Sequence, residues 1–309
     1  MQSADGPDLQ SADAPEDNVP EAATPKVAAL KVATPKAYKT IGIMGGMGPL
    51  AAVDLFNKIV TNTAADSDQE HIPIIIDSNP QIPDRTAFLL RAKTAQVVEA
   101  ASNPATAGFP SSSRPATTGP VPSNPDISNP VPLNPAPLMI ESAKRLESSG
   151  ADFILIACNT AHYFIDEVSA AVGIPVINAI KEAAAEASRL GFKKVAVLGT
   201  EGFIRHVDYP SYYSKAGVST ISPSAEEQNV ITRLIYEGVK ANKRLERNQI
   251  AGFLAVLDKL KEQKAEAFVL ACTELPIAFD MYGISGYRVI DPGLVLARKA
   301  IALAGGRQR

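Results

Sequence analysis

The sequence Ala-Asp-Phe-Ile-Leu-Ile-Ala-Cys-Asn-Thr-Ala-His, residues 151–162, decides how the rest of the chain is interpreted. An apolar run at 153–157 leads directly into Cys158 and a polar Asn-Thr pair. A short continuous apolar run predicts a strand buried on both faces. Apolar residues at helical spacing follow within 163–172 and end at Gly173. Cys158 is therefore expected where a strand gives way to a helix N-terminus, whose dipole favours a thiolate.

The second of the two cysteines lies in a near copy of this stretch. Ala265-Glu-Ala-Phe-Val-Leu-Ala-Cys-Thr-Glu274 has the same acidic residue after its first Ala, an apolar run, Ala-Cys and a polar pair. Two more pairs of segments repeat in the same order: 41–46 with 195–200, and Val176-Ile-Asn178 with Val289-Ile-Asp291. We interpret the repeat as two related α/β halves, which would bring Cys158 and Cys272 to opposite walls of one cleft.

Length and composition exclude several classes of protein. The 309 residues suit about two domains, and a hydrophobic content of 46% can form a core. The net charge of −3 and the absence of a basic stretch argue against nucleic-acid or anionic-membrane partners. No apolar run approaches the roughly 20 residues of a membrane span, and neither a secretory signal nor a transit peptide is expected. Two thiols at matching strand ends indicate reactive groups in the reducing cytoplasm rather than a disulfide.

Two segments lack the pattern of a folded domain. Residues 1–38 are rich in Ala, Pro and acidic residues, and we expect a disordered tail. Residues 102–137 contain ten of the chain's 24 prolines and little charge, which indicates a low-complexity insert. The insert either covers the mouth of the cleft or extends into solvent, and the second arrangement is favoured.

The remaining segments alternate between strand and helix patterns. Strands are expected at 40–44, 72–76, 153–157, 174–178, 195–198, 218–221, before Cys272 and at 289–291, and helices at 50–60, 86–98, 138–149, 163–172, 180–190, 226–240, 249–264 and 292–303. This alternation predicts an α/β fold of two pseudo-symmetric domains, each a mostly parallel sheet flanked by helices, with the active site between them. The predicted first domain comprises 39–175 plus 286–309, and the second comprises 176–285. Ligands of such folds bind at the carboxyl ends of the strands.

Two features at predicted strand ends suit anions. Gly45-Gly-Met-Gly48 forms a turn before a helix that begins at Pro49, and such a helix N-terminus attracts anions. The turn also fits a loose dinucleotide pattern, but the next acidic strand end, Asp77, lies too far along the chain for that function. Arg85 starts another helix, where it either clamps a carboxylate or is an ordinary surface arginine.

Two facing thiols suit proton transfer at a carbon atom. One cysteine, as a thiolate, removes a proton from one face, and the other, as a thiol, returns one to the opposite face. The alternative for either cysteine alone is a small buried core residue, and the matched positions favour function. His71, His162 and His206 lack metal-ligand spacing, and no cofactor motif is present, so neither metal nor cofactor is expected.

Five segments together resemble the cofactor-independent aspartate/glutamate racemase family, and the aspartate racemase branch in particular. They are Ile43-Met-Gly-Gly-Met-Gly-Pro49, Asn79-Pro-Gln-Ile-Pro-Asp-Arg85, Ala157-Cys-Asn-Thr-Ala-His162, Tyr236-Glu-Gly-Val-Lys240 and Ala271-Cys-Thr-Glu274. The resemblance covers residue 39 to the end, apart from the insert. It implies racemisation of a dicarboxylic amino acid by paired cysteines without pyridoxal phosphate, in a two-domain protein that is usually a homodimer.

The resemblance also implies roles for individual residues. Cys158 and Cys272 would be the catalytic acid and base, and Arg85 and Lys240 would bind the side-chain carboxylate. The remaining substrate-binding residues would be Asn159, Thr160, Ala161, Thr273, Thr200, Met47, Asn79 and Glu274. Glu274 either contacts the substrate ammonium, which is favoured, or caps a turn, and His162 is expected to be structural.

Two other functions stay open at this point. One is a non-catalytic protein that binds dicarboxylic amino acids, and the other is a decarboxylase or isomerase of the same superfamily. The presence of both cysteines argues against a variant that uses one. Aspartate and glutamate differ by one methylene, worth about 1–3 kcal/mol in a pocket, so the sequence does not choose between them.

Overall fold

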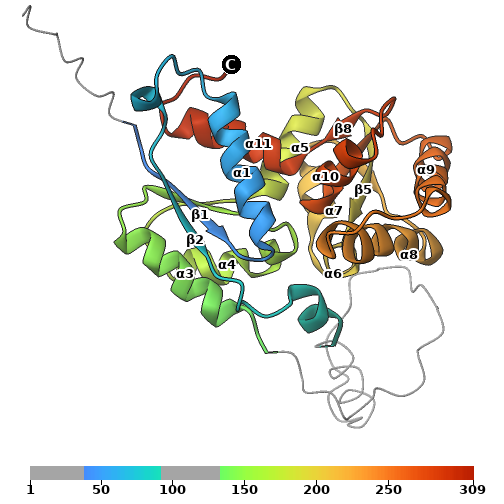
Figure 1. Cartoon of the computed structure of the whole chain (residues 1–309), viewed down its shortest axis with the longest axis horizontal. Coiled ribbons are helices and arrows are strands. Elements are labelled where there is room, and N and C mark those ends of the chain that lie inside the picture. The colour runs from blue at the N-terminus through green and yellow to red at the C-terminus, as the bar shows by residue number, and fades with distance from the viewer. Residues whose placement is uncertain (1–37, 92–132) are drawn as a thin grey trace, which may run out of the picture. The chain divides into compact units, whose positions relative to one another are not determined.

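The computed structural model describes residues 38–91 and 133–309. Residues 1–37 of the predicted tail and residues 102–132 of the predicted insert therefore lie outside the described residues. The first sheet has four parallel strands in the order β2-β1-β3-β4 (Figure 1). Its strands are β1 (Ile41–Gly45), β2 (Ile74–Ser78), β3 (Phe153–Ile156) and β4 (Val176–Ile177).

The second sheet repeats the topology of the first. It is parallel, with the order β6-β5-β7-β8. Its strands are β5 (Lys194–Gly199), β6 (Ser219–Ile221), β7 (Ala267–Ala271) and β8 (Val289–Ile290). In both sheets the strand that comes second in the sequence lies at one edge, followed across the sheet by the first, the third and the fourth. The structure therefore confirms the predicted α/β fold with two related parallel sheets.

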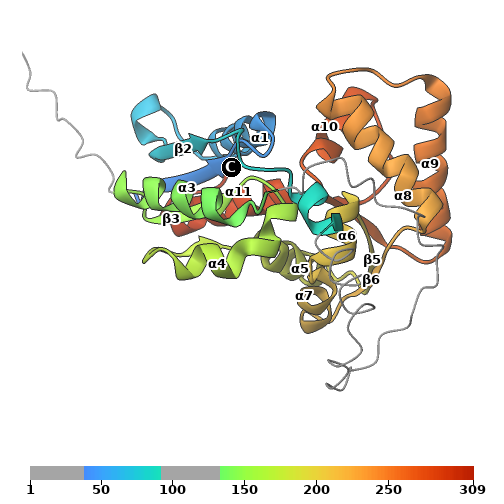
Figure 2. The same cartoon turned by 90° about the horizontal axis from the view of Figure 1, so that it is seen from below.

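Helices cover both faces of the first sheet because its central strands are buried on both sides. On β3, Phe153 and Leu155 pack toward one hydrophobic cluster, whereas Ile154 and Ile156 pack toward another. This alternation follows from the period of two along a strand. The covering helices are α1 (Pro49–Asn62) and α11 (Pro292–Leu303) on one face, and α3 (Ala136–Ser148) and α4 (Ile165–Ala170) on the other (Figure 2).

The second sheet is enclosed in the same way. On β5, Val195 and Val197 join one cluster, and Ala196 and Leu198 join the other. One face carries α5 (Ala179–Arg189), α6 (Glu201–His206) and α7 (Tyr209–Lys215). The opposite face carries α8 (Ala225–Arg233), η4 (Leu234–Lys240), α9 (Arg247–Glu262) and α10 (Glu274–Met281). The structure also contains two 3-10 helices, η1 (Asp68–Glu70) and η3 (Thr160–Phe164).

The chain crosses between the sheets twice. β4 pairs with β3, but the following helix, α5, packs on the second sheet. β8 pairs with β7, and α11 then returns to pack beside α1. The predicted boundaries at 176 and 286 had placed both short strands with the wrong sheet. The strand pairings correct this: β4 belongs to the first sheet and β8 to the second, because the chain crosses to the other sheet only after each of these strands. The division into domains stays a proposal.

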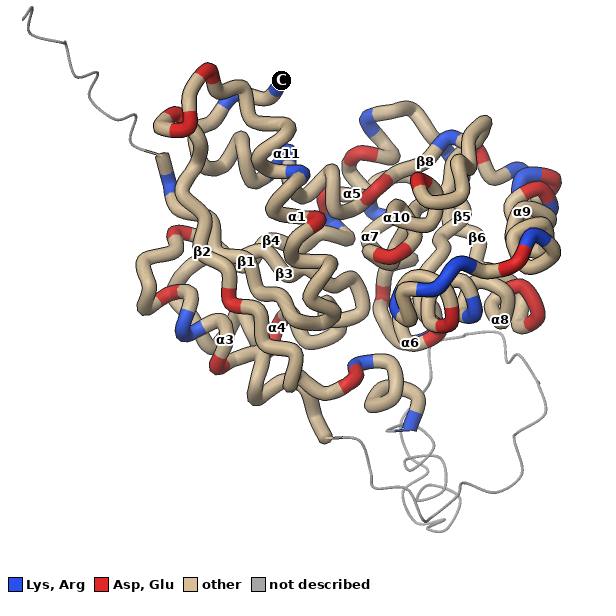
Figure 3. The backbone as a smooth tube through the Cα atoms, viewed as in Figure 1, with Lys and Arg blue, Asp and Glu red and all other residues tan. Residues whose placement is uncertain are grey.

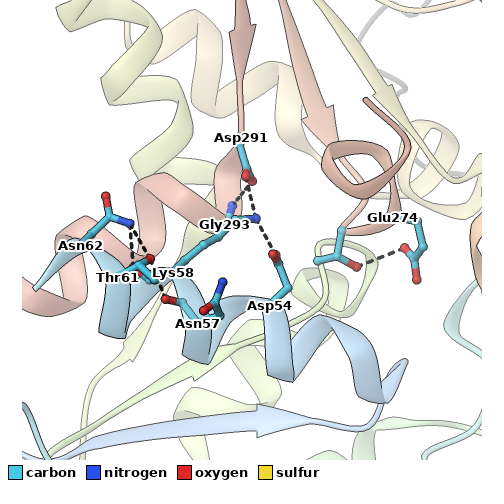
Figure 4. Close-up of polar contacts among 9 residues, drawn as sticks. Asp54, Asn57, Lys58, Thr61, Asn62, Glu274, Asp291 and Gly293 are labelled. Carbon is cyan, nitrogen blue, oxygen red and sulfur yellow. Dashed lines mark hydrogen bonds and ion pairs between the residues drawn. The ribbon is translucent and has the colours of Figure 1, made fainter. Parts of the chain in front are cut away.

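A partly buried ion network marks the second crossing (Figure 4). Lys58 Nζ lies 2.5 Å from Asp54 Oδ2 and 2.7 Å from Asp291 Oδ2. Asp291 also caps α11, because its carboxylate accepts a hydrogen bond from the Gly293 amide at 2.8 Å. Burial lowers the pKa of Lys58, but Asp291 and Asp54 outweigh burial and raise it. The network therefore ties α1 to the start of the returning helix.

Several element boundaries differ from the predictions. β2 begins at Ile74, because Pro73 cannot donate a backbone hydrogen bond to a neighbouring strand. The polar, aromatic segment 202–215 contains two helices, α6 and α7, which had not been predicted. The last two residues of the predicted insert, Ala136 and Pro137, belong to α3. Of the predicted helix at 86–98, residues 86–91 are described and are helical, and the helix begins one residue earlier, at Arg85; the rest lies outside the described residues.

Acidic and basic residues are interspersed along the described trace (Figure 3). No helix among residues 38–91 and 133–309 is long and apolar enough to cross a membrane. Within the same residues, no group of three or more His, Cys, Asp and Glu side chains could hold a metal ion.

Candidate active site

Both cysteines line one cleft at the carboxyl ends of the strands. Cys158 follows β3 of the first sheet, and Cys272 follows β7 of the second. Residues from both sheets meet in this narrow cleft. It is lined by Met47, Asp84, Arg85, Thr86, Cys158, Asn159, Thr160, Thr200, Tyr236, Lys240, Ala271, Cys272, Thr273 and Glu274.

Cys272 is held by an acidic neighbour. Its Sγ donates to Glu274 Oε2 at 2.8 Å, and the Thr273 hydroxyl donates to the same oxygen at 3.1 Å. Burial raises the pKa of the Cys272 thiol well above its usual range, and the Glu274 carboxylate raises it further. Cys158 is less buried than Cys272 and has no carboxylate hydrogen-bonded to its sulfur in the described structure. The two thiols therefore lie in unlike surroundings.

Lys240 supplies positive charge at the end of η4. Its Nζ lies 3.9 Å from Glu274 Oε1 and 4.7 Å from the centre of the Tyr236 ring. Burial lowers the pKa of Lys240, but the nearby Glu274 carboxylate and Cys272 raise it overall. η4 is a π-helix, a wider form often found at functional sites, and it presents both Tyr236 and Lys240 to the cleft.

Arg85 is a buried cation without an acidic partner. Its guanidinium donates to the backbone carbonyls of Ile82 and Pro83, at 3.2 and 3.0 Å, and to that of Met47 at 2.5 Å. Its Nε is buried and makes no hydrogen bond in the described structure, and no described carboxylate lies within ion-pairing distance. A buried charge normally has a counter-charge. The arrangement therefore favours a role for Arg85 in binding an anionic ligand over the alternative interpretation, an ordinary surface arginine.

Three threonine hydroxyls connect the two sheets across the cleft. Thr200 Oγ1 lies 2.9 Å from Thr160 Oγ1 and accepts from Thr86 Oγ1 at 3.2 Å. Thr200 also caps α6, because its hydroxyl accepts from the Phe203 amide at 3.2 Å. A Cβ at Gly202 would come within 2.8 Å of Thr86 Cα, so glycine permits this close approach. The chain of hydroxyls can donate to a carboxylate bound beside it.

His162 has a structural position. The Ala179 amide at the start of α5 donates to His162 Nε2 at 3.0 Å, and the Cys158 carbonyl lies 2.9 Å from Nδ1. Since the amide can only donate, Nε2 must be the acceptor and Nδ1 must carry the proton. Burial lowers the pKa of His162 to about 4, so the ring is neutral at pH 7. It links the loop that carries Cys158 to the first crossing.

The cleft brings together most of the predicted site residues, and two lie elsewhere. Ala161 is fully buried in the core of the first sheet. Asn79 does not line the cleft, and its Oδ1 accepts from the Gln81 amide at 3.0 Å. Asn79 instead supports the glycine turn: Gly46 has φ +89°, and a Cβ there would lie 2.2 Å from the Asn79 carbonyl carbon.

Four lining residues had not been predicted as site residues: Asp84, Thr86, Tyr236 and Ala271. Asp84 and Thr86 flank Arg85 in sequence, and Ala271 precedes Cys272. Tyr236 lies about one turn before Lys240 on the same helix, so its spacing was an available signal. Burial raises the pKa of the Tyr236 hydroxyl, so it stays protonated at neutral pH.

Two parallel sheets each present a cysteine at a strand end, and Arg85 and Lys240 line the cleft between them, which is the arrangement of an α/β protein with a candidate small-molecule site. A family model described as Asp/Glu/Hydantoin racemase matches residues 94–300. The chain belongs to this family, which confirms the resemblance found in the sequence.

Individual proteins are similar over much of the chain. The broad-specificity amino-acid racemase RacX of Bacillus subtilis is 29% identical over 164 residues, which cover 53% of this chain and 70% of RacX. A glutamate racemase of Limosilactobacillus reuteri is 28% identical over 178 residues, 56% of this chain and 64% of that protein. The structure of the Picrophilus torridus aspartate racemase matches with a TM-score of 0.61 and 26% identity, covering 88% of this chain and 96% of that one.

Proposed function

We propose that this protein is an amino-acid racemase that interconverts L- and D-aspartate, or glutamate, by two-base proton transfer without pyridoxal phosphate. One cysteine thiolate takes the Cα proton and becomes a thiol. The other thiol gives its proton to the opposite face of the carbanion and becomes a thiolate. No bond other than S–H and C–H is made or broken, and the reverse reaction exchanges the roles of the cysteines.

The observation that carries this proposal is that Cys158 and Cys272, from different sheets, line the same cleft. A racemase without a cofactor needs acid–base groups on both sides of one carbon, and thiols titrate within reach of neutral pH. The carbanion also needs hydrogen-bond donors that are already in place. The hydroxyls of Thr160 and Thr200 bond to each other at 2.9 Å, and the hydroxyl hydrogen that this bond does not use is available as such a donor.

The cations of the cleft suit a substrate with two carboxylates. Among the described residues, Arg85 is buried without an acidic partner, and Lys240 lines the same cleft, so both would bind the side-chain carboxylate. Asn159, Thr160, Thr200 and Thr273 line the cleft near the cysteines and would bind the α-carboxylate and ammonium. The similarity to an aspartate racemase favours aspartate, and the similarity to glutamate racemases keeps glutamate as the second substrate to test.

A chiral assay in D₂O tests the proposal. The purified protein, without added pyridoxal phosphate, is incubated separately with L-aspartate and L-glutamate. The expected product is the D-enantiomer with deuterium at Cα, and Cys158→Ala and Cys272→Ala should each abolish it. Bound substrate without exchange would indicate the binding protein, and released CO₂ would indicate the decarboxylase. Either result would refute the racemase.

We further propose a cytoplasmic homodimer, as the family resemblance implies. Light scattering coupled to size-exclusion chromatography tests the oligomeric state. A mass near 65 kDa, twice the chain mass of 32.6 kDa, is expected.

A further inference from the structure

Glu274 occupies an unusual position for a residue expected to bind a substrate ammonium group. Oε2 already accepts from the Cys272 thiol at 2.8 Å and from the Thr273 hydroxyl at 3.1 Å. Oε1 faces Lys240 Nζ at 3.9 Å. Both oxygens are therefore engaged with the protein, and one of them with the reacting sulfur.

The carboxylate is fixed in place by its surroundings. Glu274 is the first residue of α10 and is only 9% exposed. A negative charge is favourable at a helix N-terminus, and Lys240 partly balances it. Its contacts with the Cys272 thiol, the Thr273 hydroxyl and Lys240 therefore fix the carboxylate beside the thiol.

An ionised carboxylate discriminates between the two forms of Cys272. It accepts a hydrogen bond from the thiol, but it repels the thiolate across the same short distance. Cys158 has no such neighbour hydrogen-bonded to its sulfur in the described structure. The pair is thus asymmetric before any substrate binds.

We propose that Glu274 is a positioning residue that keeps Cys272 as the protonated, proton-donating member of the cysteine pair in the free enzyme. This inference rests on the proposed racemisation and deepens it. The enzyme in its resting form then accepts the enantiomer whose Cα hydrogen faces Cys158. The burial of Cys272, which also raises the pKa of its thiol, acts in the same direction.

The chain allows a direct test because it contains only two cysteines. In a Cys158→Ala background, absorbance at 240 nm as a function of pH reports the ionisation of Cys272, after subtraction of the same titration for the protein lacking both cysteines. Glu274→Gln keeps the size of the side chain and removes its charge. We expect the thiolate midpoint to fall by about one pH unit, that is, about tenfold more thiolate at a given pH below it.

Two variants serve as controls. Glu237→Gln, also in the Cys158→Ala background, removes an exposed carboxylate of η4 that pairs with Arg233 at 3.5 Å, and it should leave the midpoint unchanged. Glu274→Asp keeps the charge and should retain part of the effect. An unchanged or higher midpoint in Glu274→Gln, or an equal shift in Glu237→Gln, would overturn the inference. Because the titration needs no turnover, it stands apart from the D₂O assay, whose failure would refute the racemase instead.

Discussion

His162 gives the sharpest prediction for stability, because its buried ring must stay neutral. Both ring nitrogens are engaged: Nε2 accepts from the Ala179 amide at 3.0 Å, and Nδ1–H donates to the Cys158 carbonyl at 2.9 Å. Protonation would place a second N–H against the amide donor. Folding therefore favours the neutral form, and the pKa of His162 falls to about 4 from 6.5.

The sign and size of the pH effect follow from the difference between these two pKa values. The unfolded chain binds the proton more readily than the folded chain does, so the stabilisation is present above pH 6.5 and is lost as pH falls toward 4. The full loss is roughly 3 kcal/mol, because a pKa difference of one corresponds to about 1.4 kcal/mol. Between pH 7 and pH 5, the same relation gives a loss of about 2 kcal/mol.

Urea unfolding of wild type and His162→Gln at pH 7 and pH 5 measures this contribution. The variant is expected to be less stable at pH 7, because it loses packing and hydrogen bonds, but to lose about 2 kcal/mol less than wild type on acidification. His71→Gln, at a partly exposed position, controls for the removal of one imidazole. Equal pH dependence in wild type and His162→Gln would refute the assignment of a buried neutral ring.

The remaining predictions concern activity and the second crossing. Cys158→Ser and Cys272→Ser should each lower kcat/KM in the chiral assay by about 100- to 10,000-fold, the usual contribution of an acid–base group. Arg85→Met should weaken substrate binding by about 1.5–3 kcal/mol, because it removes hydrogen bonds to the charged carboxylate of the substrate. The KM should therefore rise roughly 10- to 150-fold. Lys58→Met leaves two carboxylates unpaired and should lower the free energy of unfolding by about 3 kcal/mol. Lys299→Met removes a more exposed ion pair, with Glu182 at 3.3 Å, and should lower it by less than about 1 kcal/mol.

The sequence predicted the fold and the site best where a repeated segment included the end of a strand. The matching stretches around Cys158 and Cys272 predicted two strands of the same kind, and parallel pairing places the ends of such strands at one edge of each sheet. The predicted role of His162 as a structural residue agrees with its hydrogen bonds. These predictions depend only on local pattern and on the general geometry of parallel sheets.

Other parts of the site could not be predicted, because they depend on tertiary contacts. The spacing within 226–240 suggested one regular helix, but its last part is π-helical, which turns Tyr236 into the cleft. The partners of Arg85 are backbone carbonyls, one of them 38 residues away in sequence, and no side-chain pattern reports such contacts. The Cys272–Glu274 hydrogen bond likewise depends on how α10 begins.

The sequence shows that Val176-Ile-Asn178 and Val289-Ile-Asp291 are repeated, but only the structure shows what the two segments do. Asn178 caps α5, and its Nδ2 donates to the Tyr212 hydroxyl of α7 at 3.1 Å. Asp291 caps α11 and binds Lys58 of α1 at 2.7 Å. In each case the cap residue lies between a strand of one sheet and a helix that packs on the other sheet. Its side chain also contacts a second helix on that other sheet. The repeat therefore encodes the crossing itself, which explains why boundaries drawn before these segments gave each strand to the wrong sheet.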